Sequence, residues 1–451
     1  MDSIHQALRA WRQVDGKPES LLTSLLLVRH QQQSLDPTAQ RLATNQILLE
    51  GLEALAEKDA LGAQILRSRF LNGEAILKVA YQLNLSEYQV NRIQHKALEN
   101  LADLLQTREQ AYQQAVALEL AKNLPPPSYT TLFGLENLQA KILDVLQRPT
   151  APWLLALTGL GGLGKTALAH TLAQKVIPTY HFEHLLWVRI PGMLEGSAPP
   201  EQTFEALMGQ IAAQLFPTQD PELRQKSQIR QTLKAAPHLV VIDNLETDAE
   251  ALYLFEHLQD LGGPSKFLIT SRTCPPVQAN LLTIPLEELT QPEALALLRH
   301  QAHLTGQEVL VEAPVETLLP IYEATGGNPL ALKLIVGLAN LLPLPYILQD
   351  LPKAQIGQVE KLYTQIYLKT WQTLSPSART LLQFMPLVAE SGGTVAHLQA
   401  LSALSERELS AALAELVTRS LLEMRGHALE RRYGIHRLTE TFLRTEIIHW
   451  E

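Results

Sequence analysis

The 451-residue chain has little of several features, and each shortage excludes a class of protein. Its single cysteine, Cys274, cannot form an internal disulfide, which excludes a disulfide-stapled secreted scaffold. The first residues, MDSIHQALRAWRQ, contain no apolar signal core, and the longest uncharged apolar run, Leu334–Gln349, is short and holds two prolines. The formal net charge of −9 argues against a broadly basic protein that coats nucleic acid. We therefore expect a cytoplasmic protein with no membrane partner.

What the chain does have is enough apolar sequence to fill large cores. Hydrophobic residues make up 46% of it and charged residues 18%, which is typical of folded chains. The length predicts about two to four domains. Residues 1–122 are rich in Leu, Ala, Gln and Glu, which predicts a helical N-terminal domain. The stretch NLPPPSYT at 123–130 stops a helix and favours an extended, proline-rich linker.

Five short apolar runs follow the linker and alternate with amphipathic helical segments. They are WLLALTG, HLLWVRI, HLVVIDN, KFLITSR and LLTIPLE, which begin at residues 153, 184, 238, 266 and 281. Short apolar runs bounded by turn residues are typical of buried parallel strands, and the helical segments between them suit crossover connections. The pattern predicts an α/β domain with a parallel sheet over 131–285, in a multidomain α and α/β chain. From Glu287 onward helical patterns take over.

The loop after the first apolar run matches the phosphate-binding pattern G-x-x-x-x-G-K-[ST], which identifies the α/β domain as a P-loop domain. Gly159, Gly164, Lys165 and Thr166 fit the pattern without a mismatch. Glycines let backbone N–H groups point at phosphate oxygens, and the following helix adds its positive dipole end. Lys165 is expected to contact the β- and γ-phosphates, and the Thr166 hydroxyl to bind Mg²⁺. The predicted loop ligands are Gly159, Gly161, Gly162, Leu163, Gly164, Lys165, Thr166 and Ala167.

Two later strands end in side chains suited to a phosphate site. HLVVIDN contains Asp243, which we expect to hold the Mg²⁺ shell together with Thr166. Asn244 follows where a second acid often activates the attacking water, and Glu246 lies further along, so the catalytic base stays open between them. KFLITSR ends in Arg272, whose guanidinium can pair with a γ-phosphate, although a surface arginine is the alternative.

The order of these motifs and the residues in them resemble those of the NB-ARC class of STAND nucleotide switches, to which plant resistance proteins and apoptosome cores belong. LFGLENLQAKILDVL, at 132–146, resembles the motif near the adenine and implies contacts from Phe133 and Gly134. HFEHLLWVRI, at 181–190, resembles the second-strand motif. IPLEELTQPEALALLRHQA, at 284–302, resembles the beginning of the first helical subdomain.

Two further motifs extend the resemblance into the C-terminal third of the chain. TGGNPLALKLI, at 325–335, resembles the G-x-P-L-A motif, which implies that Pro329 packs on the adenine. YGIHRLTETFL, at 433–443, resembles the histidine motif of a winged-helix subdomain, which implies that His436 contacts the β-phosphate of ADP. The resemblance implies a helical subdomain over 286–352 and a winged helix over 353–451.

The chain departs from the family pattern at three positions. Leu135 stands where arginine is usual, and this departure puts a sensing contact in question. Arg437 stands where the histidine motif often has aspartate, which implies a different latch for the winged helix. Asn244 stands in place of an acid, and this departure implies slow hydrolysis.

The N-terminal domain carries a helix-turn-helix pattern over about 65–105. Ser86 is a fair N-cap for its second helix, and the stretch KVAYQLNLSEYQVNRIQHKALENL resembles the DNA-reading module of bacterial sigma factors. An interaction domain that kept this shape without binding DNA is the alternative, because acids and bases nearly balance before the linker. The DNA-contact candidates are Gln89, Asn91, Arg92, His95 and Lys96.

Together these features predict an ATP/ADP-dependent switch with Mg²⁺ and slow ATPase activity, serving signalling, defence or regulation. ADP would hold a closed form through His436, and ATP exchange would open it for partner binding or self-assembly. Two alternatives stay open: a DNA-binding transcription regulator gated by the ATPase, and a constitutive ATPase that remodels DNA or protein. Because no repeat period follows the last motif, we expect a separate sensor or effector protein. Ile447, Ile448 and Trp450 are candidates for its docking edge, with a packed C-terminal helix as the alternative.

Overall fold

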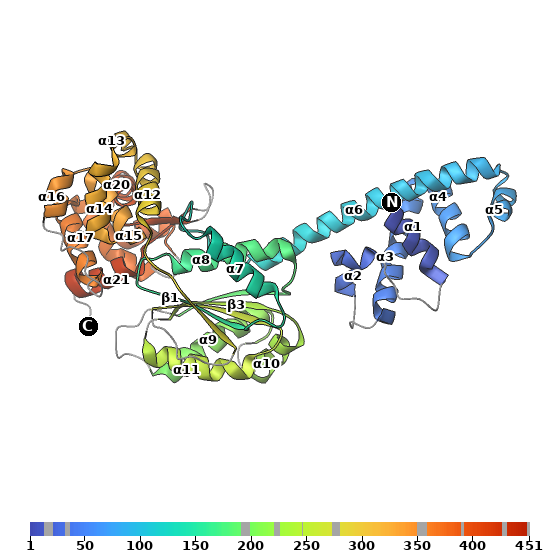
Figure 1. Ribbon diagram of the computed structural model, residues 1–451, viewed down its shortest axis with the longest axis horizontal. Helices are drawn as coiled ribbons and strands as arrows, with labels where there is room; N and C mark the ends of the chain where they lie inside the picture. Colours follow the sequence, from blue (N-terminus) through green and yellow to red (C-terminus); the bar gives the residue numbers. More distant parts are fainter. Residues whose placement is uncertain are drawn as a thin grey trace. The chain divides into compact units, whose positions relative to one another are not determined.

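The computed structural model describes ten stretches of the chain (Figure 1). They are residues 1–12, 21–31, 37–190, 199–220, 226–245, 247–272, 280–349, 359–388, 392–425 and 431–448. Of the residues singled out above, Cys274, Glu246 and Trp450 lie outside these stretches. The chain divides into two compact units, Met1–Leu120 and Ala121–Glu451, which are taken in turn.

Every described element of the N-terminal unit is helical, as the sequence predicts. The elements are α1 (Asp2–Arg9), η1 (Ala10–Arg12), η2 (Leu21–Ser24), α2 (Leu26–Gln31), α3 (Pro37–Lys58), α4 (Ala60–Leu66), η3 (Arg67–Leu71), α5 (Ile76–Leu83) and α6 (Glu87–Ala121). The main core lies between α3 and α6, where Leu48, Leu52 and Leu101 are fully buried. A smaller core joins α4, α5 and the start of α6. Helix α6 ends at Ala121, just before the prolines.

Helices α5 and α6 are joined by a short turn within the predicted helix-turn-helix. Asn84 ends α5 in the left-handed region, with φ 53°. Ser86 caps α6: its Oγ accepts from the Gln89 N–H at 3.2 Å, and Gln89 Oε1 accepts from the Ser86 N–H at 2.8 Å. The N-cap predicted at Ser86 is confirmed, while the likeness to a DNA-reading module stays a prediction.

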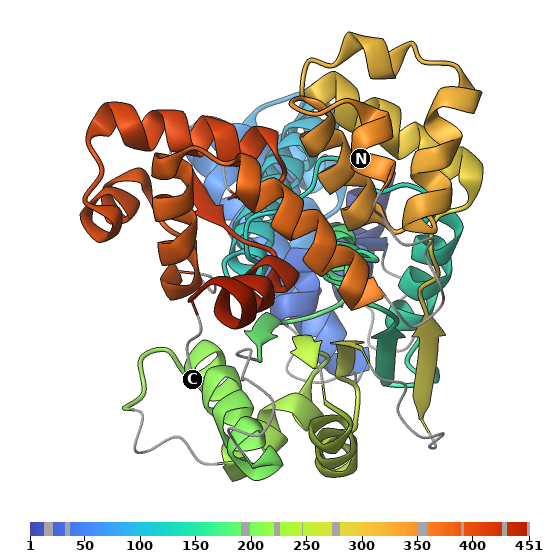
Figure 2. The ribbon, with the colours of Figure 1, turned by 90° about the vertical axis from the view of Figure 1, so that its left-hand side faces the viewer.

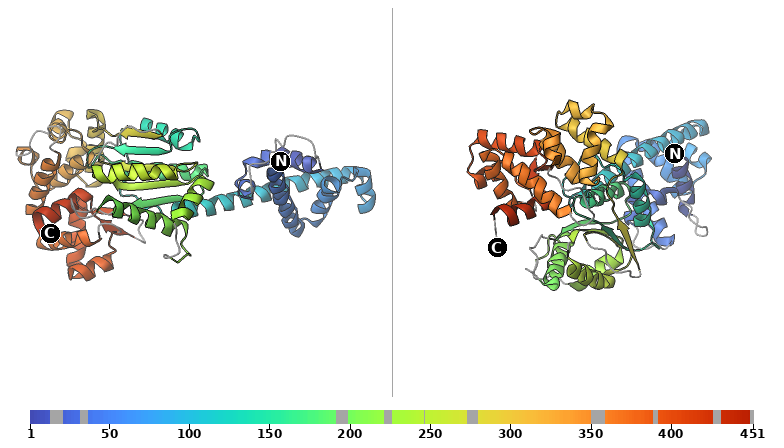
Figure 3. Two further views of the ribbon diagram at one scale, coloured as in Figure 1. Left: turned by 90° about the horizontal axis from the view of Figure 1, so that it is seen from below. Right: turned by 60° about the vertical axis from the view of Figure 1, so that its left-hand side comes forward.

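A five-stranded parallel sheet forms the centre of the C-terminal unit, and this confirms the predicted fold class (Figure 3). Its strands are β1 (Leu154–Thr158), β2 (Leu185–Arg189), β3 (Leu239–Leu245), β4 (Lys266–Ser271) and β5 (Leu281–Pro285), in the order β2-β3-β4-β1-β5. All five coincide with the predicted apolar runs. The central strands β1 and β4 are buried along their whole length, which explains why they are continuously apolar.

Helices cover both faces of this sheet. They are α7 (Glu136–Gln147), α8 (Lys165–Val176), η4 (Ile177–Thr179), α9 (Pro200–Leu215), α10 (Lys226–Ala235), α11 (Asp248–Leu258) and η6 (Gln259–Leu261). Figure 1 shows α7 and α8 on one face and α9, α10 and α11 on the other. The sheet is therefore the middle layer of a three-layer domain. Because its strands are parallel, their amino ends meet at one edge and their carboxyl ends at the opposite edge.

After the sheet the unit is almost entirely helical (Figure 2). Its elements are α12 (Gln291–Leu304), α13 (Glu308–Val311), α14 (Val315–Thr325), α15 (Pro329–Ala339), α16 (Leu344–Gln349), α17 (Val359–Thr373), α18 (Pro376–Phe384), η7 (Met385–Val388), α19 (Val395–Ser402), α20 (Glu406–Thr418), β6 (Glu423–Arg425), β7 (Arg432–Gly434), α21 (Arg437–Phe442) and η8 (Leu443–Ile448). Strands β6 and β7 pair antiparallel. One core runs from Leu289 to Leu443, across both predicted subdomains, so their boundary and the winged helix stay predictions.

The packing of the C-terminal residues bears on the predicted docking edge. Ile447 and Ile448 pack partly buried against this core, which favours the packed C-terminal helix over a docking edge. Within the described stretches, no helix combines the length and the apolar character needed to cross a membrane.

Candidate functional site

A cavity of about 330 Å³ opens at the carboxyl ends of the strands. Its lining comes from residues 125–135, the glycine loop, the ends of β2, β3 and β4, and the helical region that follows the sheet. Parallel α/β sheets bind ligands at this edge, and the volume falls within the range of small-molecule sites. The cavity lies where strand topology and the predicted phosphate loop coincide.

The glycine loop runs from β1 into α8 and lines this cavity. Gly164 is the N-cap of α8 with φ 91°, and Gly162 has φ 81°, which are values that residues with a Cβ rarely adopt. The Lys165 ammonium donates to the carbonyl oxygens of Gly159 at 2.6 Å and Leu160 at 2.8 Å. The loop curls around its own lysine and places the N-terminus of α8 at the cavity.

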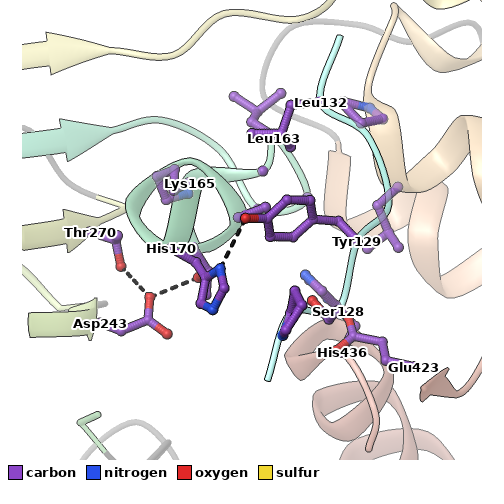
Figure 4. A pocket seen from close by; sticks show the side chains of 18 of the residues that line it. Ser128, Tyr129, Leu132, Leu163, Lys165, His170, Asp243, Thr270, Glu423 and His436 are labelled. Atoms are coloured by element: carbon purple, nitrogen blue, oxygen red, sulfur yellow. Dashed lines mark hydrogen bonds between the residues drawn. The ribbon is translucent and has the colours of Figure 1, made fainter. Parts of the chain in front are cut away.

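Asp243 is the best-connected acid of the site. It is 1% exposed at the end of β3, and its Oδ1 accepts hydrogen bonds from Thr166 Oγ1 and Thr270 Oγ1, each at 2.7 Å. Figure 4 shows the carboxylate directed at the Thr270 hydroxyl. The two predicted Mg²⁺ ligands, Thr166 and Asp243, are therefore adjacent, and their hard oxygen atoms suit that ion.

Arg189 is a functional candidate that the sequence reasoning missed. It ends β2, lines the cavity, and its Nε lies 4.0 Å from Asp243 Oδ2. Arg272, which follows β4, lines the same cavity, while its contact with a γ-phosphate stays a prediction. The sequence could have indicated Arg189, because this residue stands at the end of a predicted buried strand, as Asp243 and Arg272 do.

Asn244 is held in a structural role by its neighbours. Its backbone is in the left-handed region at φ 80°, which asparagine tolerates better than most residues. Its N–H donates to Thr270 Oγ1 at 2.8 Å, and its side-chain amide donates to the Ile190 carbonyl oxygen at 3.3 Å. An amide has no basic atom with a pKa suited to removing a proton from water. The other candidate base, Glu246, lies outside the described residues.

His436 lines the cavity from the far end of the chain. It caps α21, because its Nδ1 accepts from the Leu438 N–H at 3.1 Å, so the neutral ring carries its proton on Nε2. Burial lowers the pKa of His436 to about 4, and Glu423 opposes that shift. Three cations lower this pKa further: Arg272, Arg189 and Lys165. In Figure 4, Glu423 and His436 lie together, across the cavity from Asp243.

Helices α15, α17 and α21 touch the glycine loop directly. The Asn328 side-chain amide donates to the Gly161 carbonyl oxygen at 3.0 Å, and its Oδ1 accepts from the Tyr363 hydroxyl at 2.6 Å. A Cβ at Gly162 would collide with Tyr363, and one at Gly161 would meet Leu438 at 3.1 Å. Asn328 was not predicted, although an Asn before Pro329 is a recognisable helix cap.

The predicted linker also lines the cavity. The Tyr129 hydroxyl lies 2.9 Å from His170 Nδ1, and His170 Nε2 lies 2.7 Å from the Pro125 carbonyl oxygen. Because a carbonyl only accepts, Nε2 carries the ring proton and Nδ1 accepts from Tyr129. Residues 123–130 belong to no helix or strand, and they pack on α8, which the sequence did not indicate.

The remaining predicted contacts divide into two groups. Phe133, Leu163, Ala167 and Pro329 line the cavity, and so does Leu135, which was noted as a departure from the family pattern and not as a contact. Gly134 and Gly159 are not among its lining residues. Gly134 has φ 70° and lies against the Glu293 carboxylate, whereas Gly159 supplies a carbonyl oxygen to Lys165. Both glycines therefore shape the site through the backbone.

The DNA-contact candidates lie together on the exposed side of α6, in the N-terminal unit. Gln89, Asn91, Arg92, His95 and Lys96 are all exposed. Gln89 is engaged in the helix cap, and Lys96 Nζ donates to Glu99 at 3.2 Å. His95 Nδ1 lies 3.6 Å from the same carboxylate. The helix itself therefore neutralises part of this face.

Comparison with known proteins supports the reading of the cavity. The NB-ARC domain family matches residues 135–305. An Arabidopsis thaliana protein whose name describes a disease resistance protein is 25% identical over 227 residues, which are 49% of this chain and 24% of that protein. The matched region thus spans about a quarter of the length of that relative.

Among the solved structures that resemble the chain, two serve as examples. A Signal Transduction ATPase with Numerous Domains (STAND) protein with a tetratricopeptide repeat sensor, from Pyrococcus horikoshii, has a TM-score of 0.45 and 18% identity, covering 71% of this chain and 43% of that one. The ORC2 protein of Aeropyrum pernix, solved in ADPNP–ADP complexes, has a TM-score of 0.34 and 11% identity, covering 73% and 98%. The NB-ARC match contains the glycine loop and all five strands, so residues 135–305 are similar to an NB-ARC domain of the P-loop NTPases.

Proposed function

We propose that this chain is an ATP/ADP-dependent switch, closed with ADP and opened when ATP replaces it. One observation carries the proposal: a single cavity is lined both by the phosphate loop and by Pro329 and His436 of the helical region. A ligand in this cavity contacts both parts at once. Any change of nucleotide then changes how well the two parts hold together.

The phosphate side of the site is built from charge and hydroxyl groups. Lys165, Arg189 and Arg272 all lie close enough to influence the titration of His436. Phosphate oxygens pair well with these cations and with the N–H groups at the start of α8. Thr166 and Asp243 would hold Mg²⁺, which when bound neutralises charge on the β- and γ-phosphates.

The opposite side would act as the latch. With Nδ1 of His436 occupied by the cap of α21, its Nε2–H is the atom left to donate to a phosphate oxygen of ADP. Pro329, at the first turn of α15, and Phe133 offer apolar surface for the adenine. Asn328 donates to the loop and accepts from the Tyr363 hydroxyl, and these two bonds support a closed form in this conformation.

Hydrolysis in this site should be slow. A positioned base contributes about 10²–10⁴-fold to such reactions, and Asn244 supplies none. The slow step would keep the chain in one nucleotide state long enough for that state to act as a signal. A fast constitutive remodelling ATPase is the less supported alternative.

The open state would engage a sensor or effector protein, or assemble with other copies. A partner can shift a two-state equilibrium only if it binds one state better than the other. Pull-down from the native host followed by ADP-release measurements tests this requirement. Unaltered release with every recovered partner would count against it.

Displacement of a fluorescent ADP analogue from the full chain, by ADP and by ATP with Mg²⁺, tests the switch itself. We expect ADP to bind more tightly than ATP in the absence of a partner. If His436→Ala still binds nucleotide but holds ADP no more tightly than ATP, the preference for ADP comes from His436. Equal affinities in the wild type would reject a closed ADP form.

DNA binding by the N-terminal unit is a second candidate, which rests on the capped turn between α5 and α6 and the exposed Arg92. In the full chain, Arg92→Ala with Lys96→Ala should flatten the salt dependence of DNA binding by about one to two units. Arg29→Ala with Lys58→Ala, which removes two exposed charges elsewhere, is the control. A wild-type chain that ignores DNA at low salt would leave α6 as a protein-interaction helix.

A further inference from the structure

The amino ends of β2 and β3 carry a histidine pair that the nucleotide cavity does not use. His184 directly precedes β2, and His238 directly precedes β3. The strands are parallel neighbours, with Leu185 opposite Leu239, so their amino ends meet at the edge of the sheet away from Asp243. The two Nδ1 atoms lie 3.2 Å apart, and the rings stack with centroids 5.1 Å apart. Nitrogens this close share either one proton or one metal ion.

Glu183 completes a group of three potential ligands. One ligand atom from each of Glu183, His184 and His238 lies within 4.8 Å of the other two. The backbone fixes this approach, because the Glu183 N–H donates to the Pro237 carbonyl oxygen at 2.8 Å. His238 is fully buried while Glu183 is exposed, so an ion could reach the group from solvent.

The nitrogen geometry suits a tetrahedral ion. A Zn–N bond of about 2.0–2.1 Å and a tetrahedral angle place two ligand nitrogens about 3.3–3.4 Å apart. The observed separation of 3.2 Å needs almost no adjustment. An N–H···N hydrogen bond at this length would be at the long end of its range.

The second ring nitrogen of His238, Nε2, also has the kind of hydrogen-bond partner that it has in metal-binding histidines. Its Nε2 lies 3.2 Å from the Thr232 carbonyl oxygen of α10, which places the proton on Nε2 and the lone pair on Nδ1. With the proton on Nε2, the Nδ1 lone pair is on the side of the ring that faces His184.

We propose that Glu183, His184 and His238 form a site for a divalent transition-metal ion, with Zn²⁺ the preferred occupant. Two imidazoles and a carboxylate leave one tetrahedral position for water. Mg²⁺ prefers all-oxygen sites, so this group is chemically distinct from Thr166 and Asp243. The ion joins β2 to β3, whose opposite ends supply Arg189 and Asp243 to the nucleotide cavity.

Metal titration of the full, EDTA-treated chain tests the site. We expect calorimetry to find saturable Zn²⁺ binding and Co²⁺ to give the visible absorption of a tetrahedral complex. At Zn²⁺ near 100 times Kd, the thermal midpoint should rise by on the order of 5 °C, and Mg²⁺ should not replace Zn²⁺. Absence of saturable Zn²⁺ binding would overturn the proposal.

Three variants localise the binding. His184→Gln should weaken it by more than the roughly 10–100-fold that loss of an outer partner costs, and Glu183→Gln should weaken it less. His181→Gln, which removes a nearby histidine outside the group, should bind as the wild type does. Unchanged binding in His184→Gln would leave the pair as a hydrogen bond between strands. If that variant does not fold, the Co²⁺ spectrum of Glu183→Gln decides, because an unaltered spectrum excludes the carboxylate.

Discussion

The two sides of the nucleotide cavity differ in where they come from along the chain. The phosphate side is assembled from the glycine loop and three strand ends between residues 159 and 272, and it carries most of the charged and hydroxylic side chains discussed above, such as Lys165, Thr166 and Asp243. The opposite side comes from Pro329 and His436, and Asn328, next to Pro329, donates a hydrogen bond to the loop. We therefore expect the first side to hold a nucleotide without the second. The difference indicates that binding and switching should be separable by mutation.

The largest effect is expected on the phosphate side. Lys165→Ala or Asp243→Asn should weaken Mg-nucleotide binding by about 100-fold or more, because each removes a charge that faces phosphate or metal. Calorimetry with ADP and Mg²⁺ measures this change. Lys175→Ala, on the same helix but bonded to Gln139, serves as the control and should bind normally. Normal binding in Lys165→Ala would refute the assignment of the loop.

On the latch side, the effect should appear in ADP release rather than in binding as a whole. His436→Ala removes a donor to a phosphate oxygen, and a bond of this kind contributes about 1.5–3 kcal/mol, so release should accelerate about 10- to 100-fold. Stopped-flow release of a fluorescent ADP analogue measures it. His397→Ala, exposed on α19, is the matched control. Retention of ADP as firm as in the wild type would make His436 purely structural.

A smaller effect is expected where the two sides touch. Asn328→Ala removes the 3.0 Å bond to Gly161 and the acceptor of the Tyr363 hydroxyl, which costs about 1–3 kcal/mol for a buried group. ADP release should accelerate by roughly tenfold or less, with a lower thermal midpoint. Asn340→Ala, exposed at the end of α15, controls for the loss of an amide. If only stability changes, Asn328 holds α15 and does not couple the two sides.

The smallest effect concerns pH. The folded pKa of His436, about 4, lies below its ordinary value of 6.5, so the unfolded chain takes up the proton first. Stability should therefore be full above pH 6.5 and fall as pH drops toward 4. His436→Asn keeps a capping acceptor and should show a shallower fall in nucleotide-free melting between those values, with His238 keeping part of it. Identical pH profiles would mean that His436 is protonated or exposed in the folded chain.

The sequence predicted most of the phosphate side and little of the opposite side. Apolar runs fixed the five strands, and a strand in a parallel sheet delivers its last residue to the same edge as its neighbours. Asp243 and Arg272 could therefore be found from local patterns. The bonds from Asn328 to Gly161 and from Tyr129 to His170 join segments far apart in the chain, and no local pattern reports such pairings. For the same reason the sequence predicted an extended, proline-rich linker but not its packing on α8.

The identity of the nucleotide in the freshly purified chain, together with its turnover rate, tests the central claim most directly. A switch closed by ADP should emerge with close to one ADP per chain when the denatured protein is examined by chromatography, and its steady-state ATP hydrolysis should be far below the enzyme median of about 10 s⁻¹. A chain that emerges empty and hydrolyses ATP at about 10 s⁻¹ or faster would contradict the switch and make it a working ATPase.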